Sequence, residues 1–83
     1  MKYQIALTMK EIMLKNGRNT VWYGDLELIE ECAELSGVKI QHPQKTIKYI
    51  LDNLDRSPCF TKVLSRFMRK IVCRLRLNEV SRQ

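Results

Sequence analysis

Residues 43–56 carry the clearest pattern of apolar and polar positions in the chain. A 3.6-residue period places four apolar side chains on one face, which predicts an amphipathic helix. Pro43 suits its first turn, where a backbone N–H has no helical partner. The expected core side of this helix consists of Ile47, Ile50, Leu51 and Leu54. Its amino-terminal turns carry polar side chains elsewhere, including Gln44, Lys45 and Lys48.

Two further helices are expected earlier in the chain. Apolar residues recur at helical spacing over residues 3–16 and 25–36, and each stretch is followed by a glycine that can end a helix in the left-handed conformation. Asp25 is the expected N-cap of the second helix. Between these helices, residues 20–23 are rich in β-branched and aromatic side chains and predict a short strand. Trp22 in this strand is expected to lie in the core.

The segment that follows Ser57 supports two interpretations. With Ser57 as N-cap and Pro58 as first residue, residues 58–77 form an apolar stripe at helical spacing and an all-α, four-helix domain results. With a period of two, residues 60–64 and 71–77 become the strands of a β-hairpin, and residues 65–70 its loop. This loop contains no Gly, Pro, Asn or Asp, which disfavours the hairpin. The pattern alone leaves both folds open.

The composition indicates one small globular domain. The chain of 83 residues is 45% hydrophobic and 29% charged, so we expect a single domain over residues 1–83 with a frayed tail at 78–83. No apolar run approaches the roughly 18 residues that span a bilayer, and no signal peptide is evident. We therefore expect a cytoplasmic protein that does not enter a membrane.

Charge is distributed unevenly along the chain. Residues 1–41 hold five Lys and Arg and six Asp and Glu, a net of −1, whereas residues 42–83 hold ten and three, a net of +7. A basic half of this kind favours a polyanionic partner. Four glutamates are expected to form a solvated face of the second helix that does not approach phosphates: Glu27, Glu30, Glu31 and Glu34.

Residues capable of catalysis or metal binding are scattered. Cys32, Cys59 and Cys73 form no CxxC pair and are expected to be buried thiols, and His42 alone cannot complete a zinc site with them. No phosphate-binding glycine loop, HExxH or GxSxG motif occurs. We therefore expect no enzymatic activity, no metal and no cofactor.

Taken in order, these elements resemble the winged helix-turn-helix superfamily of DNA-binding domains. The resemblance covers about residues 5–77 and rests on the order helix, short strand, helix, helix, hairpin. Within it, residues 45–63 resemble the passage from recognition helix to first wing strand, and residues 70–75 resemble the returning strand. It implies a small α+β domain with three helices, a short strand and a C-terminal β-hairpin.

The resemblance also implies a function and the residues that perform it. A non-enzymatic regulator of transcription would read the major groove of double-stranded DNA with helix 43–56 and contact phosphates with the basic segment 62–76. Because one small module reads few base pairs, a homodimer on a two-fold site is expected. The implied DNA-contacting residues are Gln44, Lys45, Thr46, Lys48 and Tyr49 on the helix and Lys62, Arg66, Arg69 and Lys70 in the hairpin.

Another function follows from the helical interpretation of the C-terminal segment. Residues 60–77 would then be a basic amphipathic helix, and the protein an adaptor that docks a protein partner or a second copy. RNA binding is less consistent with so few, scattered aromatic residues. A membrane-surface role is less consistent with arginines spread around the helical wheel.

Overall fold

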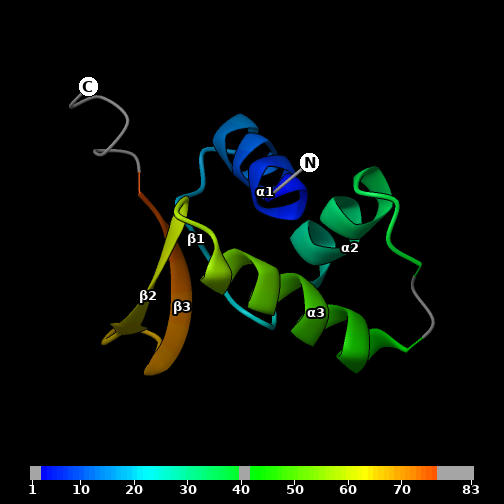
Figure 1. Cartoon of the computed structure of the whole chain (residues 1–83). Coiled ribbons are helices and arrows are strands. Elements are labelled where there is room, and N and C mark those ends of the chain that lie inside the picture. The colour runs from blue at the N-terminus through cyan, green and yellow to red at the C-terminus, as the bar shows by residue number, and fades with distance from the viewer. Residues whose placement is uncertain (1–2, 40–41, 77–83) are drawn as a thin grey trace.

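The computed structural model describes residues 3–39 and 42–76, which fold into three helices and a three-stranded sheet (Figure 1). The elements in chain order are α1 (Gln4–Lys15), β1 (Thr20–Val21), α2 (Leu26–Leu35), α3 (Pro43–Arg56), β2 (Phe60–Ser65) and β3 (Lys70–Leu75). The predicted α+β architecture is confirmed, and the all-α alternative is wrong. The predicted tail at 78–83 lies outside the described residues.

The hairpin forms because β3 finds a second partner. The sheet is antiparallel with the order β1-β3-β2, so β3 is its central strand. Thr20 pairs with Arg74 and Val21 with Cys73, and the Leu75 N–H donates to the Asn19 carbonyl at 2.9 Å. These hydrogen bonds are available to a strand but not to a helix over residues 58–77.

Ser57 belongs to the end of α3 and does not begin a further helix. Its hydroxyl donates to the Leu54 carbonyl at 2.8 Å and accepts the Cys59 N–H at 3.3 Å. Ser57 is buried, so this turn fixes the direction in which β2 leaves α3. The signal that predicted a helix start therefore marks a helix end and a turn.

The helices end where glycine permits. Gly17 and Gly37 have positive φ angles of 67° and 73°, and the residue after each donates its N–H back to the helix: Arg18 to Met13 and Val38 to Ala33, both at 2.8 Å. This is the Schellman arrangement, in which carbonyls left over at a helix end receive donors. The predicted ends of α1 and α2 are thereby confirmed.

Asp25 fastens the segment between α1 and α2. As expected it is the N-cap of α2, but its side chain makes no cap hydrogen bond. Its Oδ2 instead accepts hydrogen bonds from the backbone N–H of Trp22 and from the Arg18 guanidinium, each at 3.0 Å. One half-buried carboxylate thus ties the start of the loop to its end and sets the direction of the chain at Trp22.

The core lies where the three helices meet the inner face of the sheet. Its fully buried side chains come from every layer: Met9 and Met13 of α1, Val21 of β1, Ile29 and Cys32 of α2, Ile50 and Leu54 of α3, and Phe60 of β2. With α1 and α2 covering one side of α3, the opposite side of α3 and the hairpin tip stay open (Figure 1). These two open regions define the candidate site.

Candidate nucleic-acid interface

The first two turns of α3 present polar side chains to solvent. Core packing of Ile50 and Leu54 fixes the rotation of the helix, and this rotation leaves Gln44, Lys45 and Lys48 exposed. Tyr49 is 52% exposed and stands on the flank of the helix beside Val38 and Lys39. The predicted residues of this helix, with one exception, are therefore accessible to a partner.

Thr46 is the exception. Only 7% of its surface is exposed, and it lies one turn before Ile50 on the inner side of the helix. A phosphate cannot reach a side chain packed in this way, so we remove Thr46 from the interface. The predicted core stripe shifts accordingly: Thr46, Ile50 and Leu54 are buried, whereas Ile47 and Leu51 are only partly covered.

Two of the predicted lysines have acidic partners within the chain. Lys48 Nζ lies 3.4 Å from Asp52 one turn later on α3, and Lys62 Nζ of β2 lies 3.3 Å from Asp55. All four side chains are at least 40% exposed, so water screens both pairs. The i,i+4 spacing of Lys48 and Asp52 is visible in the sequence. The pairing of Lys62 with Asp55 depends on the turn at Ser57, so it is not visible in the sequence.

The hairpin tip gathers three of the predicted cations. Residues 66–69 connect β2 to β3, and Arg66 and Arg69 are exposed there, next to Lys70. The turn is held by Arg69 N–H, which donates to the Ser65 carbonyl at 2.6 Å, and by Met68 N–H, which donates to Ser65 Oγ at 3.2 Å. Arg69 supplies the left-handed residue of the turn, with a φ of 57°. Tertiary pairing of the strands thus compensates for unfavourable turn chemistry.

Lys70 also contacts the residue that follows β1. Its Nζ lies 3.6 Å from the centroid of the Trp22 ring, the geometry of a cation–π contact. Trp22 is half-buried and lies outside the core cluster, so the prediction of a core tryptophan is wrong. Its ring also meets Tyr23 edge-on, with centroids 4.8 Å apart. Lys70 therefore keeps its charge at the surface while it steadies the base of the tip.

A groove between α3 and the sheet was missed by sequence reasoning. It is open to solvent and has a volume of about 480 Å³. Its apolar lining comes from Trp22, Ile47, Leu51, Ile71 and part of the first strand, and its rim carries Lys48, Asp52, Asp55 and Lys62. The sequence hinted at this groove only through Ile47 and Leu51, two apolar residues of α3 beyond those that the core buries.

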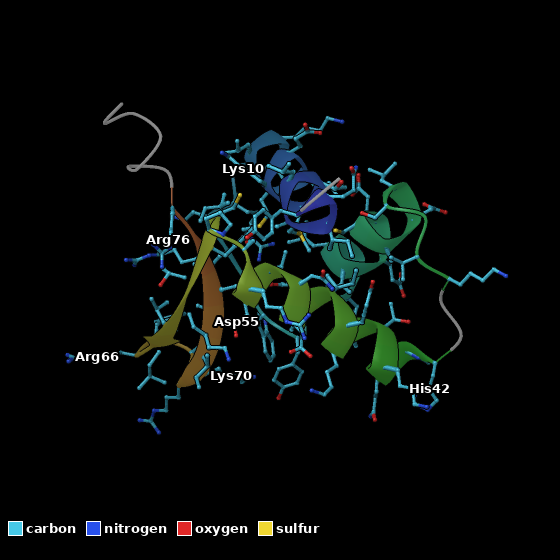
Figure 2. All side chains as sticks on the ribbon, viewed as in Figure 1. Lys10, His42, Asp55, Arg66, Lys70 and Arg76 are labelled. Carbon is cyan, nitrogen blue, oxygen red and sulfur yellow. The ribbon has the colours of Figure 1, made fainter. Side chains whose placement is uncertain are left out.

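Figure 2 shows how the charged side chains are distributed. Arg66, Lys70 and His42, the residue before α3, lie along one side of the molecule, and Lys10 of α1 lies on the opposite side. The hairpin tip and the amino end of α3 thus lie on the same side of the molecule, and Asp55 near the carboxyl end of α3 lies between them. The glutamates of α2 are exposed as predicted.

Two of the three cysteines, Cys32 and Cys73, are buried thiols. Burial raises the pKa of the Cys32 thiol from its usual 9.0 to about 11, and Cys32 Sγ donates to the Ile5 carbonyl at 3.5 Å. Burial likewise raises the pKa of Cys73. Cys59 is only half-buried, contrary to prediction.

Among the described residues, no three His, Cys, Asp or Glu side chains are placed to hold a metal ion together. The absence of catalysis and of a cofactor stays a prediction.

Within residues 3–39 and 42–76, no helix has both the length and the apolarity that crossing a bilayer requires. Comparison with protein-family models, with curated proteins and with solved structures returned no match to this chain. The function must therefore be argued from the geometry of α3 and the hairpin.

Proposed function

We propose that this protein binds double-stranded DNA without catalysis and acts as a small regulator of transcription. The observation that carries the proposal is the placement of two exposed basic regions, the amino half of α3 and the hairpin tip, on one side of the molecule (Figure 2). Three helices followed by a hairpin also resemble the winged helix-turn-helix arrangement. Both features support a partner that is long and anionic.

The amino half of α3 supplies the proposed base contacts. A helix fits the major groove, which is about 12 Å wide, when its outer side carries side chains that reach the base edges. Gln44 can pair with adenine through both amide groups, and Lys45 and Lys48 can donate to guanine or to phosphates. These three side chains are exposed. Tyr49 on the flank can donate its hydroxyl to a phosphate.

The hairpin supplies the proposed backbone contacts. Arg66 and Arg69 are exposed at the tip, and Lys70 and Lys62 lie further along the strands. Within the described residues 60–75 there is no acidic side chain, so nothing on the hairpin itself repels a phosphate. Such contacts give affinity and orientation, whereas the helix contacts give sequence preference.

The acidic residues of α3 limit how the helix can dock. Asp52 and Asp55 lie on its later turns and would repel phosphates. Their ion pairs with Lys48 and Lys62 are solvent-screened and weak, so a phosphate can replace either carboxylate as the partner of its lysine. We therefore propose that only the first two turns of α3 enter the groove.

A second candidate is a protein-binding or dimerising role for the same segment. The amphipathic helix on which that hypothesis was based does not form, since residues 60–75 are a hairpin. The hairpin still exposes the cross-strand pair Leu64 and Ile71, which are 68% and 59% exposed. A self-associating protein would bury these two side chains, which sedimentation of the wild type and of Leu64→Ser detects.

The experiment that tests DNA binding compares charge-matched substitutions on opposite sides of the molecule. Fluorescence anisotropy with a labelled duplex gives the affinity of the wild type, Lys45→Ala, Arg66→Ala and Lys10→Ala. We expect the first two substitutions each to weaken binding by about 5-fold, typical of a lost phosphate or base contact. Lys10→Ala removes the same charge from α1 and should leave the affinity unchanged. Equal losses for all three variants would overturn the proposed surface.

A further inference from the structure

The apex of the hairpin carries an aromatic side chain that the fold does not use. Phe67 is 98% exposed, the most exposed of the large apolar residues described. It has no place in the core cluster, so its contribution to folding is negligible. Leu64 and Ile71 are also exposed on this hairpin, and a group of exposed apolar side chains marks a surface that contacts a partner.

Phe67 is presented by a fixed turn. Ser65 accepts the Arg69 N–H with its carbonyl and the Met68 N–H with its hydroxyl, at 2.6 Å and 3.2 Å. The ladder between β2 and β3 continues to the pair Ser65 and Lys70, directly below the turn. Arg69 holds a positive φ of 57° without being glycine, a local strain of the kind that collects at functional sites. A turn held in this way loses little backbone freedom when the side chain at its apex binds a partner.

The flanks of Phe67 specify the charge of the partner. Arg66 precedes it, and Arg69 and Lys70 follow, with no acidic residue between 60 and 75. The partner must therefore be anionic and must also offer an apolar slot for one ring. Duplex DNA meets both requirements, because phosphates border each groove and a base step can open to accept an apolar wedge.

The rest of the surface favours DNA over other anionic partners. The basic amino end of α3 lies on the same side as the tip, so the partner extends from one to the other (Figures 1 and 2). Two hairpin tips from two copies would bring like charges together.

We propose that Phe67 enters the minor groove of bound DNA as an apolar wedge and partly unstacks one base step, while Arg66 and Arg69 contact the phosphates on either side. This inference rests on the proposed DNA binding and adds to it a kink at the site where the tip docks. Flexible pyrimidine–purine steps, such as TA, open most easily and are the preferred site of insertion.

The test uses the full chain and a labelled A·T-rich duplex with a central TA step. A 2-aminopurine base at that step brightens when it unstacks, and dyes at the two ends report bending by energy transfer. We expect the wild type to raise both signals. Phe67→Ala should bind about 10-fold more weakly and, at saturation, should raise neither signal. Phe67→Leu should raise both signals, but each by less than the wild type does. Arg66→Ala is the matched control: it weakens binding but keeps the signals at saturation.

The outcomes separate the wedge from DNA binding itself. If the wild type binds no duplex, both proposals fail. If it binds with no change in either signal, or if Phe67→Ala matches the wild type, the wedge is overturned and DNA binding stands. Loss of self-association or of anionic-vesicle binding in Phe67→Ala, with its DNA signals unchanged, would assign the ring to a second copy or to a lipid surface and overturn the wedge.

Discussion

The ammonium group of Lys70 lies 3.6 Å from the centroid of the Trp22 ring. This contact joins the first residue of β3, at the base of the hairpin tip, to the residue that follows β1. The backbone N–H of Trp22 in turn donates to the carboxylate of Asp25. The position of the tip relative to the helices therefore depends on side chains from the loop between α1 and α2.

This contact should appear as a measurable coupling between the two residues. We expect Lys70→Met and Trp22→Leu to show a coupling energy of about 0.5–1 kcal/mol in a double-mutant cycle, as partly exposed cation–π contacts do. The free energies of unfolding come from urea denaturation followed by circular dichroism. Lys62→Met is the matched control, since Lys62 lines the same groove but pairs with Asp55. Equal coupling for both lysines would contradict a specific stacking contact.

Gly24 allows the Trp22 ring to occupy its place. A Cβ at Gly24 would lie 2.4 Å from Trp22 Cη2 and Cζ2, so Gly24→Ala must displace the ring. We expect a loss of about 1 kcal/mol in stability and a shift in tryptophan emission, which reports this residue alone because the chain has one Trp. Gly37→Ala is the control. Its positive φ also makes it destabilising, but emission should not change.

Substitution of Arg69 by glycine should weaken DNA binding without a matching loss of stability. Because its φ is 57°, glycine at this position relieves backbone strain and offsets the entropy that glycine adds to the unfolded chain. We expect Arg69→Gly to change stability by less than about 0.5 kcal/mol while weakening DNA binding several-fold. Arg66→Gly loses the same charge without strain to relieve, so it should be destabilising as well. Thermal melts and anisotropy titrations of both variants test the contrast.

Stability should decline in alkaline solution through Cys32. Its pKa is raised from 9.0 to about 11 in the folded protein, so between these values the unfolded chain loses a proton that the folded chain keeps. The stabilising effect is complete below pH 9, and it is lost as the pH rises to about 11, where the loss reaches about 2–3 kcal/mol. Cys32→Ala should lower stability at neutral pH, because it removes a buried side chain, but should remove this part of the slope. An identical pH dependence in both proteins, measured by urea denaturation, would refute the assignment.

The elements that depend on local chemistry could be predicted from the sequence. α3 has the predicted bounds, and Gly17 and Gly37 end their helices as expected, because proline and glycine act within one turn of the chain. The segment after Ser57 could not be decided, since its apolar residues fit a period of 3.6 as well as one of two. The pairing of β3 with β1, more than fifty residues apart in sequence, selects the hairpin.

Part of the candidate site could be predicted from the sequence, because the helical period of α3 shows which of its side chains are exposed. Gln44, Lys45 and Lys48 are exposed because Ile50 and Leu54 face the core. Thr46 was wrongly predicted to be exposed, because a short polar side chain can be buried at a position that the apolar pattern does not mark. The contacts of Lys62 and Lys70 depend on residues brought close only by the fold, and Phe67 at the apex was ambiguous until the hairpin was established.

The most direct test of DNA binding by α3 and the hairpin is the salt dependence of affinity. Anisotropy titrations of the full chain with a duplex, between about 50 and 200 mM monovalent salt, give the slope of log affinity against log salt concentration. Each neutralised phosphate contributes about −0.9, so contacts from Lys45, Arg66, Arg69 and neighbouring lysines predict a slope of about −3 or steeper. It should become shallower by about one unit in Arg66→Ala and stay the same in Lys10→Ala. Binding that does not change with salt would contradict the account.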